Sequence, residues 1–565
     1  MTVHRTLFAC LSALLASVIL GGTATAAPGP WVTPGKSIAV QPTVDIYSSN
    51  VAVDSDGTVA AVWTVSHQNH EELQDDDTDS VMAAIRPRFG KFGIPFELSG
   101  DDHRVSNVQV VGGASGITVM WQKTMPGGDR LATRTRPPGG RFGPVGFFPA
   151  GDHGAYDSRI AMGDDGTTVA VWSRPGTAFS TVVQASIRPP GGDFGLPVDL
   201  SPEEANVNVH YPDVAITRDG TITVVWAREA VFSEQTIEAV SSPPGGSFGE
   251  PVPVSDPGWV TSPVIVAAPD GTTTVVWRNF ATGLAGLFTS SRAPGGGFGP
   301  RMLVTGANLG GNGVRPGLAV SNDGLVTAVW GVQKSEQSQD PDHPFTYDYT
   351  GMGMATWKPG QLPEKEWLGR SEGLVASPDV TTSADGSTSV IWPEGEYQKP
   401  RGLLAMTRPE GGEFSEPVRI DQDQPTSLSI ASSRDGNLVA TWPGSIDDSY
   451  VIKAASTVPS YCRKATIALG SVTRNRKAGT ARILIDAESR GLVRVKGTRQ
   501  VKPASGSIGR TGERHLKIVP RGRIAGKLNR KGRAAVRVRI SFDPRARGCL
   551  KDFARRTVTL QKRGR

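Results

Sequence analysis

A repeated unit of about 53 residues constrains the fold of this chain more than any other feature. The octet Asp270–Trp277, DGTTTVVW, returns in close variants such as DGTTVAVW and DGTITVVW. A fixed period of this length is typical of repeat architectures, in which each unit buries its apolar faces against its neighbours. Aligning the octets places eight tryptophans in register: Trp63, Trp121, Trp172, Trp226, Trp277, Trp330, Trp392 and Trp442.

The residue pattern of each unit predicts four short antiparallel strands. In one unit, the alternating residues 212–218 lead to Asp219-Gly220, which we interpret as a two-residue hairpin turn of type I′. The next strand carries the tryptophan, and a third strand over residues 235–242 ends at a Pro-Pro-Gly-Gly turn. We expect the fourth strand over residues 248–255, where a Phe-x-x-Pro element begins. The tryptophan and this phenylalanine are then expected to pack between neighbouring units.

Eight such units predict an all-β fold, an eight-bladed β-propeller over residues 28–459. The last unit lacks a fourth strand, whereas the first is preceded by a spare segment beginning WVTP at residues 31–34. We therefore expect the N-terminal strand to complete the last blade, a three-plus-one closure that removes exposed sheet edges. Seven blades are the alternative, because Ser115-Gly116 replaces Asp-Gly in the second unit and the sixth lacks the Gly-Gly turn.

The N-terminus predicts export. Arg5 precedes an apolar run over residues 7–20, and Ala24-Thr25-Ala26 follows it, which is the arrangement of a cleaved signal peptide. We assign residues 1–26 to this signal peptide and expect a secreted, extracellular protein. No other stretch is long and apolar enough to predict a transmembrane segment.

The last part of the chain, residues 460–565, predicts a second domain. It carries 30 Lys and Arg but five Asp and Glu, whereas the preceding residues carry 30 and 49. Its alternating apolar and charged residues predict a small β-sandwich. Arg494 and Lys496, like Arg537 and Arg539, are expected on one cationic face that binds an anionic polymer of the cell envelope. Docking on the acidic propeller and a merely solvated surface are the alternatives.

Two cysteines remain after signal-peptide removal. Cys462 and Cys549 both lie in the basic domain, and export to an oxidising compartment favours a disulfide between them. Two free thiols are the alternative, and the absence of a Cys-x-x-Cys pair argues against metal binding or redox use.

The variable connections of the repeat predict where ligands bind. The Asp-Gly and Pro-Pro-Gly-Gly turns lie at one end of each unit, so the longer connections gather at the other end. Aromatic rings there are expected to stack on sugars, with ordinary loop packing as the alternative. The candidate binding residues are Tyr156, Tyr211, Trp259, His343, Tyr347 and Tyr349.

Acidic residues on the same connections are candidates for catalytic or metal-binding groups. Carboxylates beside a histidine suit acid–base catalysis, although Asp and Gly are also common turn residues; these candidates are Asp101, Asp102, His103, Asp152 and His153. Asp75, Asp77 and Asp79 have the spacing of a calcium loop. Ser80 and Arg86 replace the glycine and glutamate of an EF-hand, so we interpret the segment as a solvated acidic loop and expect no cofactor.

The octets and the turns between them resemble the sialidase-like repeat propellers of secreted bacterial proteins, and the basic domain resembles the immunoglobulin-like modules of exported proteins. An active sialidase would carry a Phe/Tyr-Arg-Ile-Pro motif and Ser-x-Asp-x-Gly-x-Thr-Trp boxes. Here glycine follows the aspartate directly, as in SNDG at Ser321, and no catalytic residue can be assigned. No nucleotide-binding loop is present in the sequence.

We therefore expect a monomeric, envelope-associated binding protein rather than an enzyme. Its ligand, a glycan or a protein, would lie on the long-loop end of the propeller. The alternative is a glycoside-active enzyme, either a sialidase-like hydrolase or a polysaccharide lyase, that uses the loop carboxylates.

Overall fold

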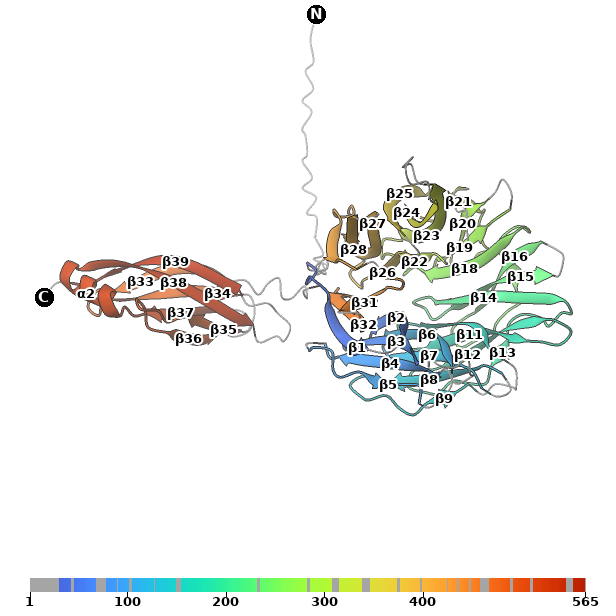
Figure 1. Ribbon diagram of the computed structural model, residues 1–565, viewed down its shortest axis with the longest axis horizontal. Coiled ribbons are helices and arrows are strands. Elements are labelled where there is room, and N and C mark those ends of the chain that lie inside the picture. The colour runs from blue at the N-terminus through green and yellow to red at the C-terminus, as the bar shows by residue number, and fades with distance from the viewer. Residues whose placement is uncertain are drawn as a thin grey trace, which may run out of the picture.

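The protein is almost entirely built from antiparallel β-strands in the part that the structure, a computed structural model, describes (Figure 1). That part runs from residue 30 to residue 563. It leaves out 42–44, 68–77, 89, 101–103, 126–127, 149–153, 231–233, 282–284, 307–314, 338–345, 373–375, 397–398, 424, 434–435, 447–448, 458–466, 488–490, 509–511 and 545–551.

The first five units each form a four-stranded sheet in which the strands follow one another in order. The first sheet is β2 (Asp45–Val53), β3 (Val59–His67), β4 (Thr78–Arg86) and β5 (Phe96–Glu97). The second is β6 (Val105–Gly113), β7 (Gly116–Lys123), β8 (Arg130–Arg136) and β9 (Gly146–Phe147), and the third is β10 (Tyr156–Met162), β11 (Thr168–Pro175), β12 (Thr181–Arg188) and β13 (Val198–Asp199). The fourth is β14 (Val207–Ile216), β15 (Ile222–Ala230), β16 (Gln235–Ser242) and β17 (Val252–Pro253), and the fifth is β18 (Val260–Ala267), β19 (Thr273–Asn279), β20 (Gly286–Arg292) and β21 (Met302–Thr305).

The next two units are antiparallel four-stranded groups joined by one parallel pair, Ser371 with Gly395. We refer to them as the sixth and seventh sheets. The sixth is β22 (Gly317–Val320), β23 (Val326–Gln337), β24 (Thr346–Trp357) and β25 (Glu364–Glu372), and the seventh is β26 (Asp379–Thr382), β27 (Thr388–Glu396), β28 (Lys399–Arg408) and β29 (Val418–Asp421). The last sheet is β30 (Ser429–Ser432), β31 (Leu438–Ile446), β32 (Ser449–Ser456) and, from the start of the chain, β1 (Lys36–Gln41).

The N-terminal strand completes the last sheet. β1 runs antiparallel to β32, from the pair Lys36–Ala454 to the pair Gln41–Tyr450. A further bridge joins Trp31 to Thr457 just outside the two strands. The prediction that the N-terminal strand pairs with the last unit is therefore confirmed.

The eight in-register tryptophans are buried between consecutive sheets. Trp226, for example, belongs to the fourth sheet and packs with Val171 and Ala185 of the third. Trp63 of the first sheet packs with Ile452 of the last, so the first and last sheets are neighbours. The interpretation of the repeated tryptophan as packing between units is confirmed, and the octet is structural.

A second packing device, which the sequence analysis did not identify, uses the arginine before the glycine-rich turn. The guanidinium of Arg292 lies over the Phe298 ring, 5.1 Å from its centre, and that of Arg188 lies over Phe194 at 5.3 Å. Arg292 also donates hydrogen bonds to Thr223 Oγ1 (2.8 Å) in the preceding sheet and to Ser241 Oγ (2.9 Å). The same arginine thus anchors its own phenylalanine and the neighbouring sheet.

Two details of the predicted unit are wrong. The Asp-Gly turn is not type I′, because only its glycine has a positive φ (Gly220, 91°) and the turn is closed by Gly220 N donating to Thr217 O. The turn therefore has a left-handed glycine at its last position. The residues before this glycine have negative φ angles, which most residue types can adopt. The fourth strand is also far shorter than residues 248–255: it is Val252–Pro253, since Phe248 turns inward to pack beside Trp226.

The basic C-terminal part contains two antiparallel sheets. One is β33 (Ile467–Asn475), β34 (Thr480–Ala487) and β37 (Gly512–Ile518); the other orders β36 (Ala504–Ile508), β35 (Gly491–Val495), β38 (Arg533–Pro544) and β39 (Asp552–Gln561). Both contribute to one apolar core, for example through Ile483 and Phe542.

A helix that the strand pattern did not predict, α2 (Gly522–Lys531), places Leu528 in the same core. It ends at Gly532 in the left-handed conformation, as helices often do. Among the described residues, no helix has the length and apolarity needed to cross a membrane.

Candidate ligand-binding face

The two ends of the repeated sheets differ in their connections. Tight turns join the first strand to the second and the third to the fourth, as at Thr217–Gly220 and Pro243–Gly246. The connections from the second strand to the third and from one sheet to the next lie at the opposite end, because neighbouring strands are antiparallel. We call this opposite end the loop end.

Exposed aromatic side chains gather at the loop end of the third, fourth and fifth sheets. Trp259 precedes β18, is 54% exposed and lies 5.9 Å, centre to centre, from the ring of Phe280 just after β19. Tyr156 begins β10 and Tyr211 lies in β14 beside His210. We name the aromatic row as these four rings with Phe179: Tyr156, Phe179, Tyr211, Trp259 and Phe280, all at least 44% exposed.

Strained backbone holds part of this row. The first strands of the second to fifth sheets are each interrupted by a bulge, and in each the bulge contains a residue with positive φ: Asn107 (48°), Asp157 (52°), Tyr211 (53°) and Ser262 (53°). This conformation costs about 1–2 kcal/mol for a residue with a Cβ, and such strain persists only where the surroundings impose it. The register breaks at corresponding points, so the four bulges are a feature of the repeat.

A cluster of charged side chains lies in or beside these bulges on β10 and β14 and just before β22. We name it the axial cluster: Asp157, Arg159, Asp213 and Arg315. Arg315 Nη2 reaches from the start of the sixth sheet to Asp213 Oδ2 of the fourth, 3.0 Å away, and donates to Pro263 O of the fifth at 2.7 Å. One side chain therefore links three sheets.

The carboxylates of the axial cluster are engaged by backbone groups. Asp213 Oδ2 also accepts a hydrogen bond from Ile265 N (2.9 Å), and Asp157 Oδ2 accepts one from Tyr211 N (3.2 Å). Asp213 is thus held by an arginine and an amide of the next sheet, which fits a positioning role better than proton transfer.

Arg159 is the most perturbed cation of the cluster. Burial, and then the neighbouring charge of Arg315, lower the pKa of Arg159 to about 10, against the opposing effect of Asp213 and Asp157. Its Nη1 donates to Ser158 O (2.9 Å) and Asn107 Oδ1 (3.4 Å). The cluster places guanidinium groups in partly desolvated surroundings, where hydrogen bonds to a polar ligand are stronger than in water.

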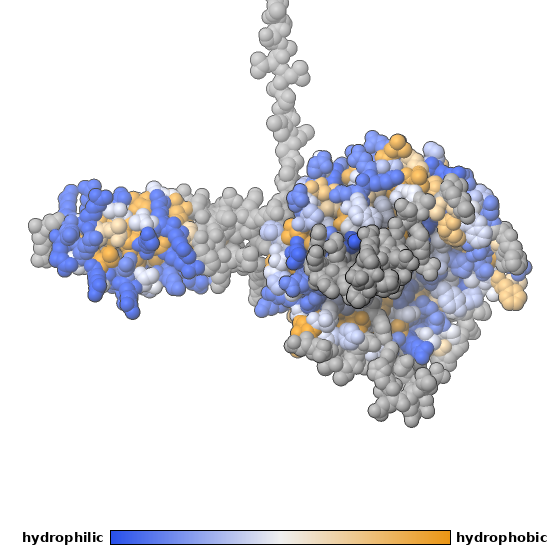
Figure 2. Space-filling model, turned by 45° about the horizontal axis from the view of Figure 1, so that its top comes forward, coloured by the Kyte–Doolittle hydropathy of each residue, from blue (hydrophilic) through white to orange (hydrophobic). Residues whose placement is uncertain are grey.

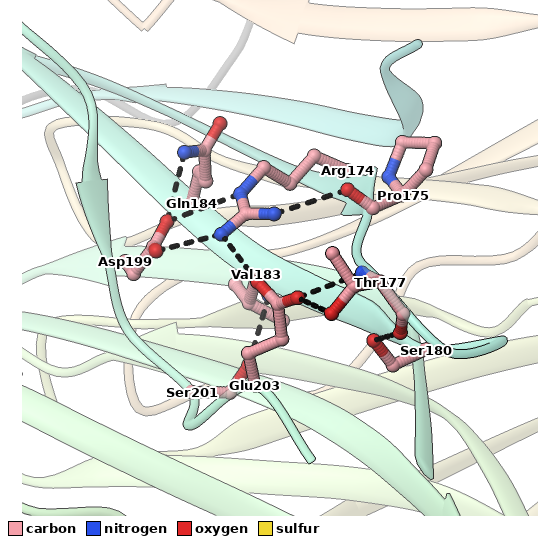
Figure 3. Close-up of polar contacts among 9 residues, drawn as sticks. All are labelled: Arg174, Pro175, Thr177, Ser180, Val183, Gln184, Asp199, Ser201 and Glu203. Carbon is pink, nitrogen blue, oxygen red and sulfur yellow. Dashed lines mark hydrogen bonds and ion pairs between the residues drawn. The ribbon is translucent and has the colours of Figure 1, made fainter. Parts of the chain in front are cut away.

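A rigid loop presents one ring of the row. The connection between β11 and β12 carries Phe179, which is 88% exposed, and both Ala178 (φ 50°) and Phe179 (φ 56°) are left-handed. Glu203 Oε1 accepts from the amide N (2.7 Å) and hydroxyl (2.6 Å) of Thr177 in this loop (Figure 3). Asn206 N donates to Ala178 O at 3.0 Å. The loop is therefore fixed from the segment that follows β13.

The same loop is tied down by a group of ion pairs. Arg174 makes two hydrogen bonds with Asp199 (2.8 and 3.3 Å) and one with Glu203 (3.2 Å), as Figure 3 shows. Hydrogen bonds from Thr177, and then from Arg174, lower the pKa of Glu203 to about 2. Glu203 is thus ionised over the physiological range, and its contacts hold the Phe179 loop in one conformation.

The predicted site residues fall into three groups. Tyr156, Tyr211 and Trp259 are exposed at the loop end, where they were expected. Asp79 is a residue of β4 and faces Ser66 across the sheet, while Tyr347 and Tyr349 are strand positions of β24. Outside the described residues lie Asp75, Asp77, Asp101, Asp102, His103, Asp152, His153, His343, Cys462 and Cys549. Within the described part, no three His, Cys, Asp or Glu side chains are arranged to hold a metal ion.

Sequence reasoning missed the axial cluster and Phe179. The charged residues of the cluster come from three units: Asp157 and Arg159 lie on β10, Asp213 lies on β14 and Arg315 comes just before β22. No local motif links the three units. One signal was available: Asp157, Tyr211 and Arg315 all stand eight residues before the aspartate of the next Asp-Gly turn.

The basic C-terminal part presents cations on the outer face of β35, β38 and β39. Arg537 and Arg539 alternate with buried residues of β38, and both are exposed. Arg539 lies directly opposite Arg555 in the sheet, and like charges in that position repel. The visible side of this part of the molecule is largely hydrophilic (Figure 2). The expected cationic face is therefore formed by one sheet.

Comparisons with known proteins give structural likenesses only. No protein-family model matches the chain, and no curated protein matches it. An α-L-arabinofuranosidase from Fusarium graminearum is 12% identical, with 54% of this chain and 92% of that chain covered and a TM-score of 0.32. A Hadza microbial sialidase is 10% identical, with 78% and 99% covered and a TM-score of 0.33. Puromycin hydrolase is 15% identical, with 75% and 62% covered and a TM-score of 0.36. At these values, nothing about the activity of this protein follows from them.

Proposed function

We propose that this chain is an exported binding protein that holds a glycan on the loop end of an eight-bladed β-propeller. The eight four-stranded sheets are the blades, and the pairing of β1 with β32 closes the ring. A β-sandwich formed by the two C-terminal sheets follows, and its cationic face binds an anionic polymer of the cell envelope.

The aromatic row carries this proposal. Five exposed rings on three consecutive sheets are a costly arrangement for a surface that touches only water, since large apolar side chains are normally buried. Two of the rings, Phe179 and Tyr211, are held on left-handed backbone, so they are presented in fixed positions. Rigid aromatic rings beside polar groups suit sugars, whose pyranose faces stack on rings while their hydroxyls form hydrogen bonds.

The axial cluster supplies the polar part of the same surface. Tyr211 is bonded through its amide to Asp157, so the aromatic row and the cluster are in contact. The guanidinium groups of Arg159 and Arg315 donate hydrogen bonds and carry positive charge. Sugars with hydroxyl and carboxylate groups are therefore the favoured ligands.

A glycan array probed with the secreted chain tests this proposal. We expect binding that falls about tenfold or more in the double variant Tyr211→Ala/Trp259→Ala, the loss typical of removing a buried aromatic contact. Trp367→Ala is the matched control, because Trp367 is 58% exposed on β25, an outer strand away from the loop end. Equal losses in the two variants, or no bound glycan, would contradict the proposal. Release of new reducing ends would favour the glycoside-active enzyme instead.

A further inference from the structure

The C-terminal pair of sheets has two ends that differ in charge. One end is formed by the turn between β33 and β34, the C-terminus of α2, the start of β38 and the end of β39. Two backbone hydrogen bonds join these segments: Arg563 N donates to Arg476 O (2.9 Å), and Lys562 N donates to Gly532 O (2.8 Å). Figure 1 shows α2 at this end of the elongated pair of sheets. We call it the basic end.

Six exposed cations cover the basic end, and they come from three separate stretches of the chain. They are Arg476 and Lys477 in the turn between β33 and β34, Arg530, Lys531 and Arg533 around the end of α2, and Arg563 after β39. Cations in the last turn of a helix stabilise its C-terminus, which accounts for Arg530 and Lys531. That effect does not extend to the other four, so helix stability does not explain the cluster.

The acidic residues of the same part lie at its opposite end. Asp486 of β34 faces Glu513 at the start of β37, and Asp543 and Asp552 lie at the end of β38 and the start of β39. The fifth, Glu488, is outside the described residues and follows β34 in the chain. Residues 467–485, 514–542 and 553–565 contain no Asp or Glu. No carboxylate side chain of this part therefore balances the six cations of the basic end.

This separation of charge orients the C-terminal part in an external field. An anionic surface attracts the basic end and repels the end that carries the carboxylates. The chain enters this part at Ile467, which begins β33 and lies opposite Ala487, at the carboxylate end. The connection to the repeat therefore leaves from the end that faces away from such a surface, and it does not obstruct the approach of the basic end.

The distribution of the cations favours a flat partner over a linear one. The six cations cover one end of an elongated body, where a plane of negative charge reaches all of them together. A linear polyanion would instead follow a row of cations, such as Arg537 and Arg539 along β38. Among the described residues of this part, no large apolar side chain is exposed. Contact with the partner is therefore electrostatic and involves no insertion of apolar groups.

We propose that the basic end docks on an anionic lipid bilayer and contacts the phosphate groups of its lipids. Clusters of about 4–8 Lys and Arg are attracted to anionic membranes by charge alone, within about one Debye length of the surface. This surface and this partner are distinct from those of the proposed function, in which the face of β35, β38 and β39 binds an anionic polymer.

Co-sedimentation of the full secreted chain with lipid vesicles tests the proposal. We expect binding to vesicles of phosphatidylglycerol and phosphatidylcholine in equal parts, and none to pure phosphatidylcholine. In Lys477→Glu/Arg563→Glu, the partition coefficient should fall about tenfold or more, because two attractive charges beside the lipid become repulsive. Arg476→Gln/Arg530→Gln removes charge from the same end without reversing it, so its loss should be smaller and in the same direction. All four side chains are exposed, so thermal unfolding of both variants should match that of the native chain.

Arg537→Glu/Arg539→Glu is the matched control, because it makes the same change in charge on the side of the same domain. Arg537 stands four residues beyond Arg533 on β38, about 13 Å away at about 3.3 Å per residue. That distance exceeds the Debye length of about 10 Å in about 100 mM salt, so the partition coefficient of this control should fall less than about threefold.

The outcomes separate this proposal from the proposed function. Vesicle binding that is kept in Arg537→Glu/Arg539→Glu but lost in Lys477→Glu/Arg563→Glu would support docking by the basic end, whether or not the chain binds cell walls. Equal losses in the two variants would show that net charge alone decides binding, and would overturn the proposal. Native binding to soluble polyphosphate without binding to the mixed vesicles would overturn the bilayer as the partner and identify a linear polyanion instead.

Discussion

Replacing Arg292 by methionine tests whether the arginine before the glycine-rich turn holds neighbouring sheets together. The native guanidinium donates hydrogen bonds of 2.8 and 2.9 Å to Thr223 and Ser241 and lies over Phe298. A hydrogen bond from a charged donor contributes about 1.5–3 kcal/mol, and the ring contact adds about 0.5–2 kcal/mol.

Two effects make the net loss smaller than the total of these contacts. The hydroxyls of Thr223 and Ser241 are 3.0 Å apart and keep each other as hydrogen-bond partners after the substitution. Burial also disfavours the charged guanidinium, which lowers the pKa of Arg292. We therefore expect Arg292→Met to reduce the free energy of unfolding by about 2–3 kcal/mol.

Differential scanning calorimetry of the secreted chain measures this effect. For a cooperative unit of about 430 residues, each 1 kcal/mol lowers the Tm by about 1 °C, so we expect a drop of about 2–3 °C. Arg301→Met is the matched control from the same sheet. Its guanidinium pairs with Asp256 at 2.6 Å, but both side chains are well exposed, and such pairs contribute about 1 kcal/mol or less. An equal drop in Tm for the two variants would refute the anchoring role of Arg292.

Two further predictions concern charge. Both carboxylate oxygens of Asp379 accept backbone amides, yet burial raises its pKa to about 6, whereas an unfolded aspartate titrates near about 3.9. The native state therefore keeps a proton that the unfolded chain has lost, so the free energy of unfolding should fall as the pH rises from about 4 to about 6. Asp379→Asn should flatten this dependence in denaturant titrations, and an unchanged slope would assign it to other groups. In the C-terminal part, Arg537→Glu/Arg539→Glu should weaken sedimentation with isolated cell walls, and native binding should decline between about 50 and 200 mM salt. Binding that is insensitive to both changes would rule out the cationic face.

Much of the fold could be predicted because the repeat expresses packing rules that are local in sequence. A tryptophan at a constant distance from each Asp-Gly turn is buried against the preceding sheet, so the period alone implies stacked units. The turn type could not be predicted from the dipeptide, because Asp219 and Gly220 are compatible with more than one backbone path. The length of the fourth strand also depended on packing, since Phe248 is drawn inward to Trp226.

The candidate site was predictable only in part. Tyr156, Tyr211 and Trp259 follow from the position of the variable connections, which strand alternation places at one end. The axial cluster does not follow, because Asp157, Asp213 and Arg315 come from three different units and meet only when the first strands converge. The presentation of Phe179 depends on Arg174 and Glu203, which are 29 residues apart and carry no recognisable motif.

The sequence by itself determined that the chain folds into repeated antiparallel sheets and that its first strand completes the last one. These properties depend on alternation, turn residues and period, which act over short distances along the chain. Tertiary structure alone decided which charges meet, which rings stay exposed and where a cavity opens. A cavity between the first and last sheets illustrates the reason: Lys36, Arg88 and Ser433 are distant in sequence, and they line this cavity only because the last sheet packs against the first.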